Sequence, residues 1–210
     1  NFLSLLGWSY DGETEIVSLA DMISTFDISG VNSSGAIFDM EKLIWMNGIY
    51  IRQMPQERLG DLLHNYWTEY PPVEFDNIPD KERAIQVAGL VSESLKTLRD
   101  AAPLVAFLYK DQIEYSLDDL IQRQMDKVST AAVLEETILR LQNIQSFSAQ
   151  TIETELRNIA TDLNLKPGQV LGTIRVATSG QKISPPLFGS LEILGKARTI
   201  RLVKQAANKL

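Results

Sequence analysis

Residues 148–180 read SAQTIETELRNIATDLNLKPGQVLGTIRVATSG, and their spacing predicts two consecutive amphipathic helices. Pro167 fits the first turn of the second helix, because the N–H that proline lacks would have no helical partner there. Ser179-Gly180 is typical of a helix end. The apolar side chains recur every three or four residues, at Ile152, Leu156, Ile159, Ala160 and Leu163 in the first helix and at Val170, Leu171, Ile174 and Ala177 in the second.

The helical period continues on both sides of this stretch. Residues 81–98 predict a helix with Asp80 as its N-cap, and residues 130–143 predict another that follows Ser129. A last helix is expected at 196–209, with Ile200, Val203 and Ala207 facing inward. No region shows sustained alternation with a period of two, so the predicted fold class is all-α.

Glycine, proline and polar clusters divide the chain into three predicted pieces. Residues 1–54 are broken by glycines into short elements and form a mixed region. Residues 55–145 and 146–210 are predicted to be two helical subdomains, with the polar stretch 145–148 between them.

The composition excludes several kinds of site. Among 210 residues there is no cysteine and one histidine, so disulfides, thiolate ligands and histidine clusters are absent. No apolar run reaches the ~18 residues of a membrane span, and we expect no membrane association. Because the chain opens at Asn1 without a methionine, inside an apolar stretch, we expect it to be part of a longer protein.

A catalytic site is difficult to assemble from these residues. There is no glycine-rich phosphate loop, and His64 lies beside an apolar face, where histidine is usually a surface or packing residue. The acids of Asp118-Asp119 and of Glu135-Glu136 are adjacent, so on a helix they point in different directions. An enzyme that uses carboxylates stays open as an alternative, which a pocket with two converging acids would support.

Charge is distributed unevenly along the chain. Residues 1–165 carry 12 lysines and arginines against 26 acidic residues, whereas residues 166–210 carry eight against Glu192 alone. This asymmetry indicates a part that faces a polyanion, although a solvated basic helix explains it too. The cations of this segment spread around a helical surface, so helix capping competes with phosphate binding as their role; they include Arg175, Lys182, Lys196, Arg198, Arg201 and Lys204.

The turn Ile183-Ser184-Pro185-Pro186-Leu187-Phe188 combines backbone groups, a hydroxyl and apolar side chains. Single-stranded bases are recognised by such mixtures of hydrogen bonding and apolar contact. The start of a helix at the prolines would explain the same residues.

Three stretches resemble glutamyl-tRNA synthetases of the bacterial type. NFLSLLGWS at 1–9 resembles the stretch shortly after the K-M-S-K-R loop of that family, and FDMEKLIWMNGIYIR at 38–52 resembles a second family motif. IRVATSGQKISPPLFGSLEILGKARTIRL at 174–202 resembles the terminal signature. The stretches occur in the family's order over nearly the whole chain.

The resemblance implies the carboxy-terminal part of a class I synthetase: a stem-contact region at 1–54 and two helical anticodon-binding subdomains at 55–145 and 146–210. The parent enzyme would attach glutamate to tRNA-Glu with ATP and Mg²⁺. The family's H-I-G-H and K-M-S-K-R motifs do not occur here. We therefore expect no cofactor in this chain, no activity from it alone, a monomer, and a cytoplasmic location.

By position within the motifs, the resemblance assigns anticodon contacts to Arg175, Ser184, Leu187, Arg157 and Ser94. It assigns contacts with the tRNA backbone or stem to Lys42, Asn47 and Arg52, and Lys182 joins these as a cation of the terminal motif. Packing is the expected role of Trp45 and Tyr50.

Ser94 departs from the family pattern, in which an arginine often stands at this position and is associated with reading the third anticodon base. A serine both donates and accepts hydrogen bonds and is small, so it should tolerate either C or G. This predicts that the parent enzyme charges tRNA-Gln as well as tRNA-Glu. The alternatives are that Ser94 lies on a solvated face or, for the whole chain, that it is a helical protein-interaction scaffold without a tRNA role.

Overall fold

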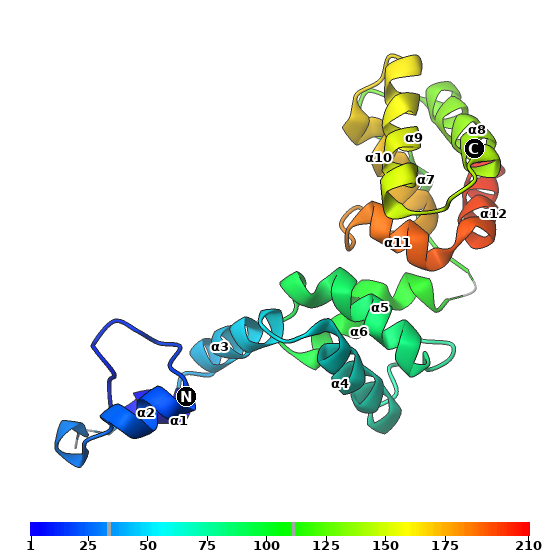
Figure 1. The fold of residues 1–210 in the computed structure, drawn as a ribbon. Coiled ribbons are helices and arrows are strands. Elements are labelled where there is room, and N and C mark those ends of the chain that lie inside the picture. Colours follow the sequence, from blue (N-terminus) through cyan, green and yellow to red (C-terminus); the bar gives the residue numbers. More distant parts are fainter. Residues whose placement is uncertain (33–34, 111) are drawn as a thin grey trace. The chain divides into compact units, whose positions relative to one another are not determined.

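The computed structural model describes residues 1–32, 35–110 and 112–210, and these residues form helices and connecting segments without a strand. The predicted all-α class is confirmed. Figure 1 shows the helices in chain order. The chain divides into two compact units, residues 1–54 with 95–97 and residues 55–94 with 98–210. The predicted division into three pieces, with boundaries after 54 and 145, stays a prediction.

The first unit holds α1 (Phe2–Gly7), α2 (Leu19–Thr25), the 3₁₀ turn η1 (Ile28–Gly30) and α3 (Met40–Arg52). Ser18 and Asp39 cap α2 and α3, each accepting a hydrogen bond from a backbone N–H three residues on. Trp8, Val17 and Met22 form a small core.

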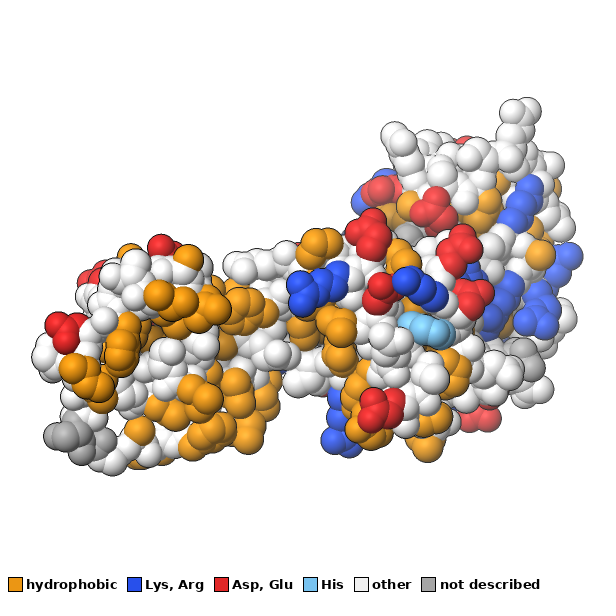
Figure 2. All heavy atoms as spheres, turned by 60° about the horizontal axis from the view of Figure 1, so that its bottom comes forward, with side chains coloured by type: hydrophobic (Ala, Val, Ile, Leu, Met, Phe, Trp, Pro, Cys, Tyr) orange, Lys and Arg blue, Asp and Glu red, His pale blue; other side chains and the backbone are white. Residues whose placement is uncertain are grey.

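The first unit also exposes many large apolar side chains. Figure 2 shows hydrophobic side chains gathered over the face of this unit that is turned to the viewer. Such side chains are exposed at Leu3, Leu19, Ile23, Phe26, Ile28, Ile37, Phe38 and Met40.

Two long helices open the second unit. They are α4 (Gln56–Glu69) and α5 (Lys81–Val91), and they pack side by side. A side-chain carbon on Gly60 would lie 2.5 Å from Ile85, so the glycine permits the close approach of the two helices. The segment after α5 contains η2 (Ser92–Ser94), η3 (Leu98–Asp100), α6 (Ala101–Val105) and η4 (Ala106–Leu108).

The remaining helices follow in order. They are α7 (Leu117–Leu120), α8 (Lys127–Asn143), α9 (Ala149–Asp162), α10 (Pro167–Ser179), α11 (Leu187–Leu194) and α12 (Lys196–Ala207). Side chains of α7, α8, α10 and α12 share one core, in which Leu120, Leu134, Val176, Ala177, Val203 and Ala206 are buried. Pro167 begins α10 and Gly180 ends it with a φ of 72°, both as predicted from the sequence.

Three sequence-based expectations need correction. The α5 helix ends at Val91 rather than at 98, because residues 95–97 leave its axis to join the first unit. The N-cap of α8 is Asp126, which forms a capping box with Ser129, so the helix begins at Lys127, three residues earlier in the chain than expected. In α12, Val203 is buried as expected, whereas Ile200 and Ala207 are only half-buried, and the buried face also includes Leu202 and Ala206, because the helix contacts both α8 and α10. No helix of the described residues is long and apolar enough to cross a membrane.

Candidate nucleic-acid interface

The side chain of Arg175 organises the turn that precedes α11. Its Nη1 donates hydrogen bonds to the Ser184 hydroxyl at 2.5 Å, to the Ser184 carbonyl at 3.1 Å and to the Pro185 carbonyl at 3.0 Å. Arg175 lies in the middle of α10, so the turn is tied to a rigid helix. Two residues that were assigned to the anticodon, Arg175 and Ser184, are therefore in direct contact.

Arg175 keeps hydrogen-bonding capacity for a ligand. A guanidinium has five N–H donors, and the three hydrogen bonds that Arg175 donates to this turn all leave from Nη1. Partial burial lowers the pKa of the Arg175 guanidinium, because removing the charge from water disfavours it. A half-buried cation with donors left over suits an acceptor edge of a base or a phosphate oxygen.

Arg157 approaches the same turn from α9. Its guanidinium lies 5.8 Å from the centre of the Phe188 ring, and it forms an ion pair of 2.7 Å with Glu153 one helical turn away. Contacts between α9 and α11 hold the two helices together. Arg157, Arg175 and Ser184, which are separated in the sequence, thus border one end of α11.

The apolar side chains of the turn differ from the sequence expectation. Leu187 is 5% exposed and packs inward, so its side chain is not an open apolar edge. Ile183 is 90% exposed and is the apolar side chain that the turn presents to solvent. Ile183 follows a polar stretch, and this is the one sequence signal that could have identified it as exposed. The apolar periodicity does not distinguish Ile183 from Leu187.

Two cations of the basic terminal segment, Arg198 and Lys196, make hydrogen bonds within the protein, although the charge of this segment suggested a surface that faces a polyanion. Arg198 donates from Nη1 to the Leu108 carbonyl at 2.6 Å and from Nη2 to the Phe107 carbonyl at 3.0 Å and to the Lys110 carbonyl. Lys196 donates to the carbonyls of Gln142 and Ile144 at the end of α8, each at 2.9 Å. Both cations therefore satisfy carbonyls that the ends of helical segments leave without a partner.

Of the other basic residues in this segment, Lys182 forms an ion pair with Asp119 at 2.5 Å, with two thirds of its side chain exposed. The hydrogen bond from Lys182 lowers the pKa of the Asp119 carboxyl, and a second bond from Ser116 acts in the same direction. Arg201 and Lys204 are exposed on α12. These two carry the charge that is turned to solvent on this helix.

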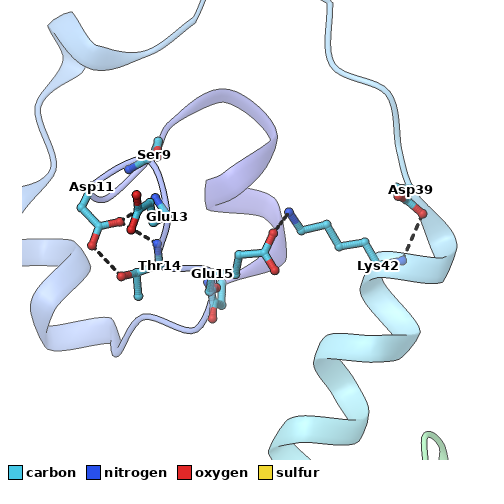
Figure 3. Close-up of polar contacts among 9 residues, drawn as sticks. Ser9, Asp11, Glu13, Thr14, Glu15, Asp39 and Lys42 are labelled. Carbon is cyan, nitrogen blue, oxygen red and sulfur yellow. Dashed lines mark hydrogen bonds and ion pairs between the residues drawn. The ribbon is translucent and has the colours of Figure 1, made fainter.

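In the first unit, Lys42 forms an ion pair with Glu15 at 2.6 Å, which Figure 3 shows beside the N-cap Asp39. Asn47 donates from Nδ2 to the Lys96 carbonyl at 2.6 Å, where Gly48 lets residues 95–97 lie close to α3. Arg52 is exposed in the last turn of α3. Arg52 is accordingly the best placed of the three for a phosphate.

The expected packing of Trp45 and Tyr50 is only partly right. Trp45 is 42% exposed and Tyr50 is 41% exposed, and the Tyr50 hydroxyl donates to the Asn1 side chain at 2.8 Å. The tyrosine therefore anchors the start of the chain to α3 with its hydroxyl. Trp45 leaves a large part of its ring on the surface.

Ser94 is exposed and ends η2, the 3₁₀ turn that continues α5. The α5 helix contacts α11, and a side-chain carbon on Gly189 would lie 3.0 Å from Leu90. Ser94 therefore follows one helix, α5, and the turn with Ser184 precedes another, α11, and these two helices pack on each other.

The residues considered for catalysis lie apart. His64 bonds through Nδ1 to the Pro79 carbonyl at 3.0 Å, which makes it a packing residue between α4 and the start of α5. In the described part of the chain, no group of three or more histidine, aspartate or glutamate side chains could hold a metal ion. Sequence reasoning did not single out Arg83, Gln86 and Gln56, which line a polar cleft in the second unit.

Comparison with known proteins gives consistent results. A family model described as an anticodon binding domain matches residues 58–207. A glutamate–tRNA ligase of Roseiflexus castenholzii is 40% identical over 212 residues, covering the whole of this chain and 42% of the relative. A glutamate–tRNA ligase of Dehalococcoides mccartyi is 35% identical over 210 residues, with 100% of this chain and 43% of the relative covered.

A solved structure resembles the chain as well. The crystal structure of a glutamate tRNA ligase from Elizabethkingia meningosepticum, in complex with its amino acid, superposes with a TM-score of 0.85 at 25% identity. The match covers 100% of this chain and 40% of that protein. The chain thus spans about two fifths of the length of the relatives it matches.

Proposed function

Because this chain belongs to the glutamate–tRNA ligase family and carries its anticodon-binding domain, we propose that it binds the anticodon stem and loop of tRNA-Glu. In this role it holds the tRNA for a ligase that joins glutamate to it. Contacts with phosphates position the tRNA, and contacts with bases in the loop select it.

The observation that carries the proposal is the arrangement around Arg175. A half-buried guanidinium is fixed on the turn that contains Ser184, and a second arginine, Arg157, lies against Phe188 at the same end of α11. Sequence-distant residues with donors and an aromatic ring at one place suit unstacked bases, which offer acceptor edges and flat faces. Leu187 supports this site from inside the fold, and Lys182 adds a partly neutralised cation next to it in the sequence.

The first unit has a lesser part in the proposal. Arg52 is proposed to touch the tRNA backbone, because it is exposed and at the end of α3. Lys42 and Asn47 are already engaged with Glu15 and the Lys96 carbonyl, so they would act on the tRNA mainly by holding α3 in place.

The chemistry is proposed to lie outside these residues. ATP, glutamate and Mg²⁺ would be bound by the part of the ligase that this chain does not contain, and this chain alone would be inactive. The protein is proposed to act as a monomer in the cytoplasm, with the tRNA-binding region divided into subdomains at about residue 145.

Ser94 is the residue on which we base a proposal about tRNA specificity. Exposed at the end of η2, it can donate and accept hydrogen bonds without excluding a purine by its size. We therefore propose that the ligase accepts tRNA-Gln as well as tRNA-Glu.

Gel-shift titration tests the main proposal. The chain should bind a tRNA-Glu transcript more tightly than a tRNA with an unrelated anticodon, and the affinity should fall as salt rises. A helical scaffold without a tRNA role would show neither the preference nor the salt dependence, and that result would reject the proposal.

A further inference from the structure

A polar cleft of about 540 Å³ lies within the second unit, between α5 and α11. Its volume is within the ~300–1,000 Å³ typical of small-ligand sites. The polar side chains at its border are Gln56, Arg83, Gln86 and Glu192, and Leu90 and Ile193 provide apolar walls. Its polar groups come from three helices, α4, α5 and α11.

The hydrogen bonds at the border show which polar atoms are already engaged within the protein. Arg83 donates from Nη1 to the Gln86 Oε1 at 3.1 Å, which leaves the Gln86 amide nitrogen as a donor. Gln56 donates from Nε2 to the Ile85 carbonyl at 2.8 Å, which leaves its Oε1 as an acceptor. The cleft therefore presents donors from Gln86 and Arg83, and acceptors from Gln56 and Glu192.

The charge of the cleft favours a neutral ligand. Arg83 and Glu192 carry opposite charges, so a phosphate would meet repulsion from the carboxylate as well as attraction to the guanidinium. A nucleobase is neutral and planar and carries donors and acceptors along one edge, which matches the alternation of groups described above.

Glycines shape the cleft. A side-chain carbon on Gly89 would lie 2.7 Å from the amide of Gln56, so Gly89 is what allows that amide to lie over α5. Gly189 lets α11 approach Leu90 in the same way. Both glycines face the cleft, and each is within a helix.

The position of the cleft agrees with the proposed anticodon site. The α5 helix continues into the turn that ends at Ser94, and α11 follows the turn that Arg175 holds. We propose that the cleft is a subsite for one unstacked base of the tRNA loop, bound along its edge by Gln56, Gln86, Arg83 and Glu192. This inference rests on the proposed function and adds a base-binding site to it.

The sharpest variant is Gly89→Ala. The new methyl group displaces the Gln56 amide from the cleft, while alanine raises the helix propensity of α5, so folding should not suffer. Gly168→Ala is the matched control, because it also replaces a helical glycine but its new carbon has no atom within 4 Å apart from its chain neighbours and the backbone of its own helix. Gln86→Ala removes the donor directly.

Binding is measured by fluorescence anisotropy with a tRNA-Glu transcript and with transcripts that differ at single loop bases. We expect Gly89→Ala and Gln86→Ala to weaken binding of the tRNA-Glu transcript about tenfold, which corresponds to about 1.4 kcal/mol, and to flatten the preference at one loop position. The slope of affinity against salt should stay that of the unmodified chain, because no phosphate contact is lost. Gly168→Ala should bind as the unmodified chain does.

Two results would overturn the inference while leaving the proposed function intact. One is binding by both cleft variants that equals that of the unmodified chain for every loop sequence. The other is uniform weakening for all loop sequences with a smaller salt slope, which would indicate a phosphate contact. If the unmodified chain shows no preference for tRNA-Glu, the proposed function and this inference fail together.

Discussion

Replacing Arg198 by alanine tests whether the basic end of the chain serves the fold or the surface. Arg198 donates to the carbonyls of Phe107, Leu108 and Lys110, about 90 residues earlier in the sequence. A hydrogen bond from a charged donor contributes roughly 1.5–3 kcal/mol to stability. Because water can reach part of this site and the three bonds share one guanidinium, their contributions do not add, and we expect a loss of about 2–4 kcal/mol.

The assay is thermal unfolding followed by circular dichroism at the helical band. In a chain of this size, 1 kcal/mol shifts the melting temperature by about 2–4 °C, so the second unit should melt ~5–15 °C lower. Arg201→Ala is the matched control, since Arg201 is exposed on the same helix. The melting temperature of Arg198→Lys should lie between those of Arg198→Ala and the unmodified chain. An ammonium keeps the charge but cannot span the carbonyls as a planar guanidinium does.

The reasoning is refuted if Arg198→Ala and Arg201→Ala melt at the same temperature. It is also refuted if Arg198→Ala keeps its stability and loses tRNA affinity with a reduced salt slope, because Arg198 would then be a phosphate contact.

Four further outcomes are expected. Arg175→Ala should weaken tRNA-Glu binding by about 1–3 kcal/mol at an unchanged helical signal, and normal binding by a variant with a much lower melting temperature would make Arg175 purely structural. Asp126→Ala removes the N-cap of α8 and should cost about 1 kcal/mol in denaturant unfolding; an unchanged midpoint would contradict the assigned cap. Lys182→Met should raise the pKa of the Asp119 carboxyl in an NMR titration, because that pKa is lowered chiefly by Lys182. The stabilising effect of this carboxylate is present above its unfolded pKa of about 3.9 and is lost as the pH falls through the lower folded value; an unmoved titration would show that the ion pair does not persist in solution. A full-length ligase with Ser94→Arg should charge tRNA-Gln less efficiently, relative to tRNA-Glu, than the unmodified ligase does. Strong rejection of tRNA-Gln by the unmodified ligase would refute the role of Ser94.

The sequence determined the class of fold and the family, because both depend on local patterns. The apolar period of 3.6 residues, together with Asp80, Pro167 and Gly180 at helix ends, is set by backbone geometry within one turn. Arg175 and Ser184 likewise lie in one continuous motif, residues 174–202. The first α8 cap assigned was wrong because Asp126 and Ser129 both suit a helix start, and only the backbone decides which lies outside the first turn.

Tertiary structure decided what each cation does and where the cleft lies. Arg198 and Arg201 are equivalent in the sequence pattern, yet one binds carbonyls about 90 residues away and the other is exposed. Gln56, Gln86 and Glu192 carry no local signal, because they come to line one cleft only when α5 packs against α4 and against α11. Local spacing records the neighbours of a residue along the chain, whereas a long side chain finds its hydrogen-bond partners through packing between distant segments.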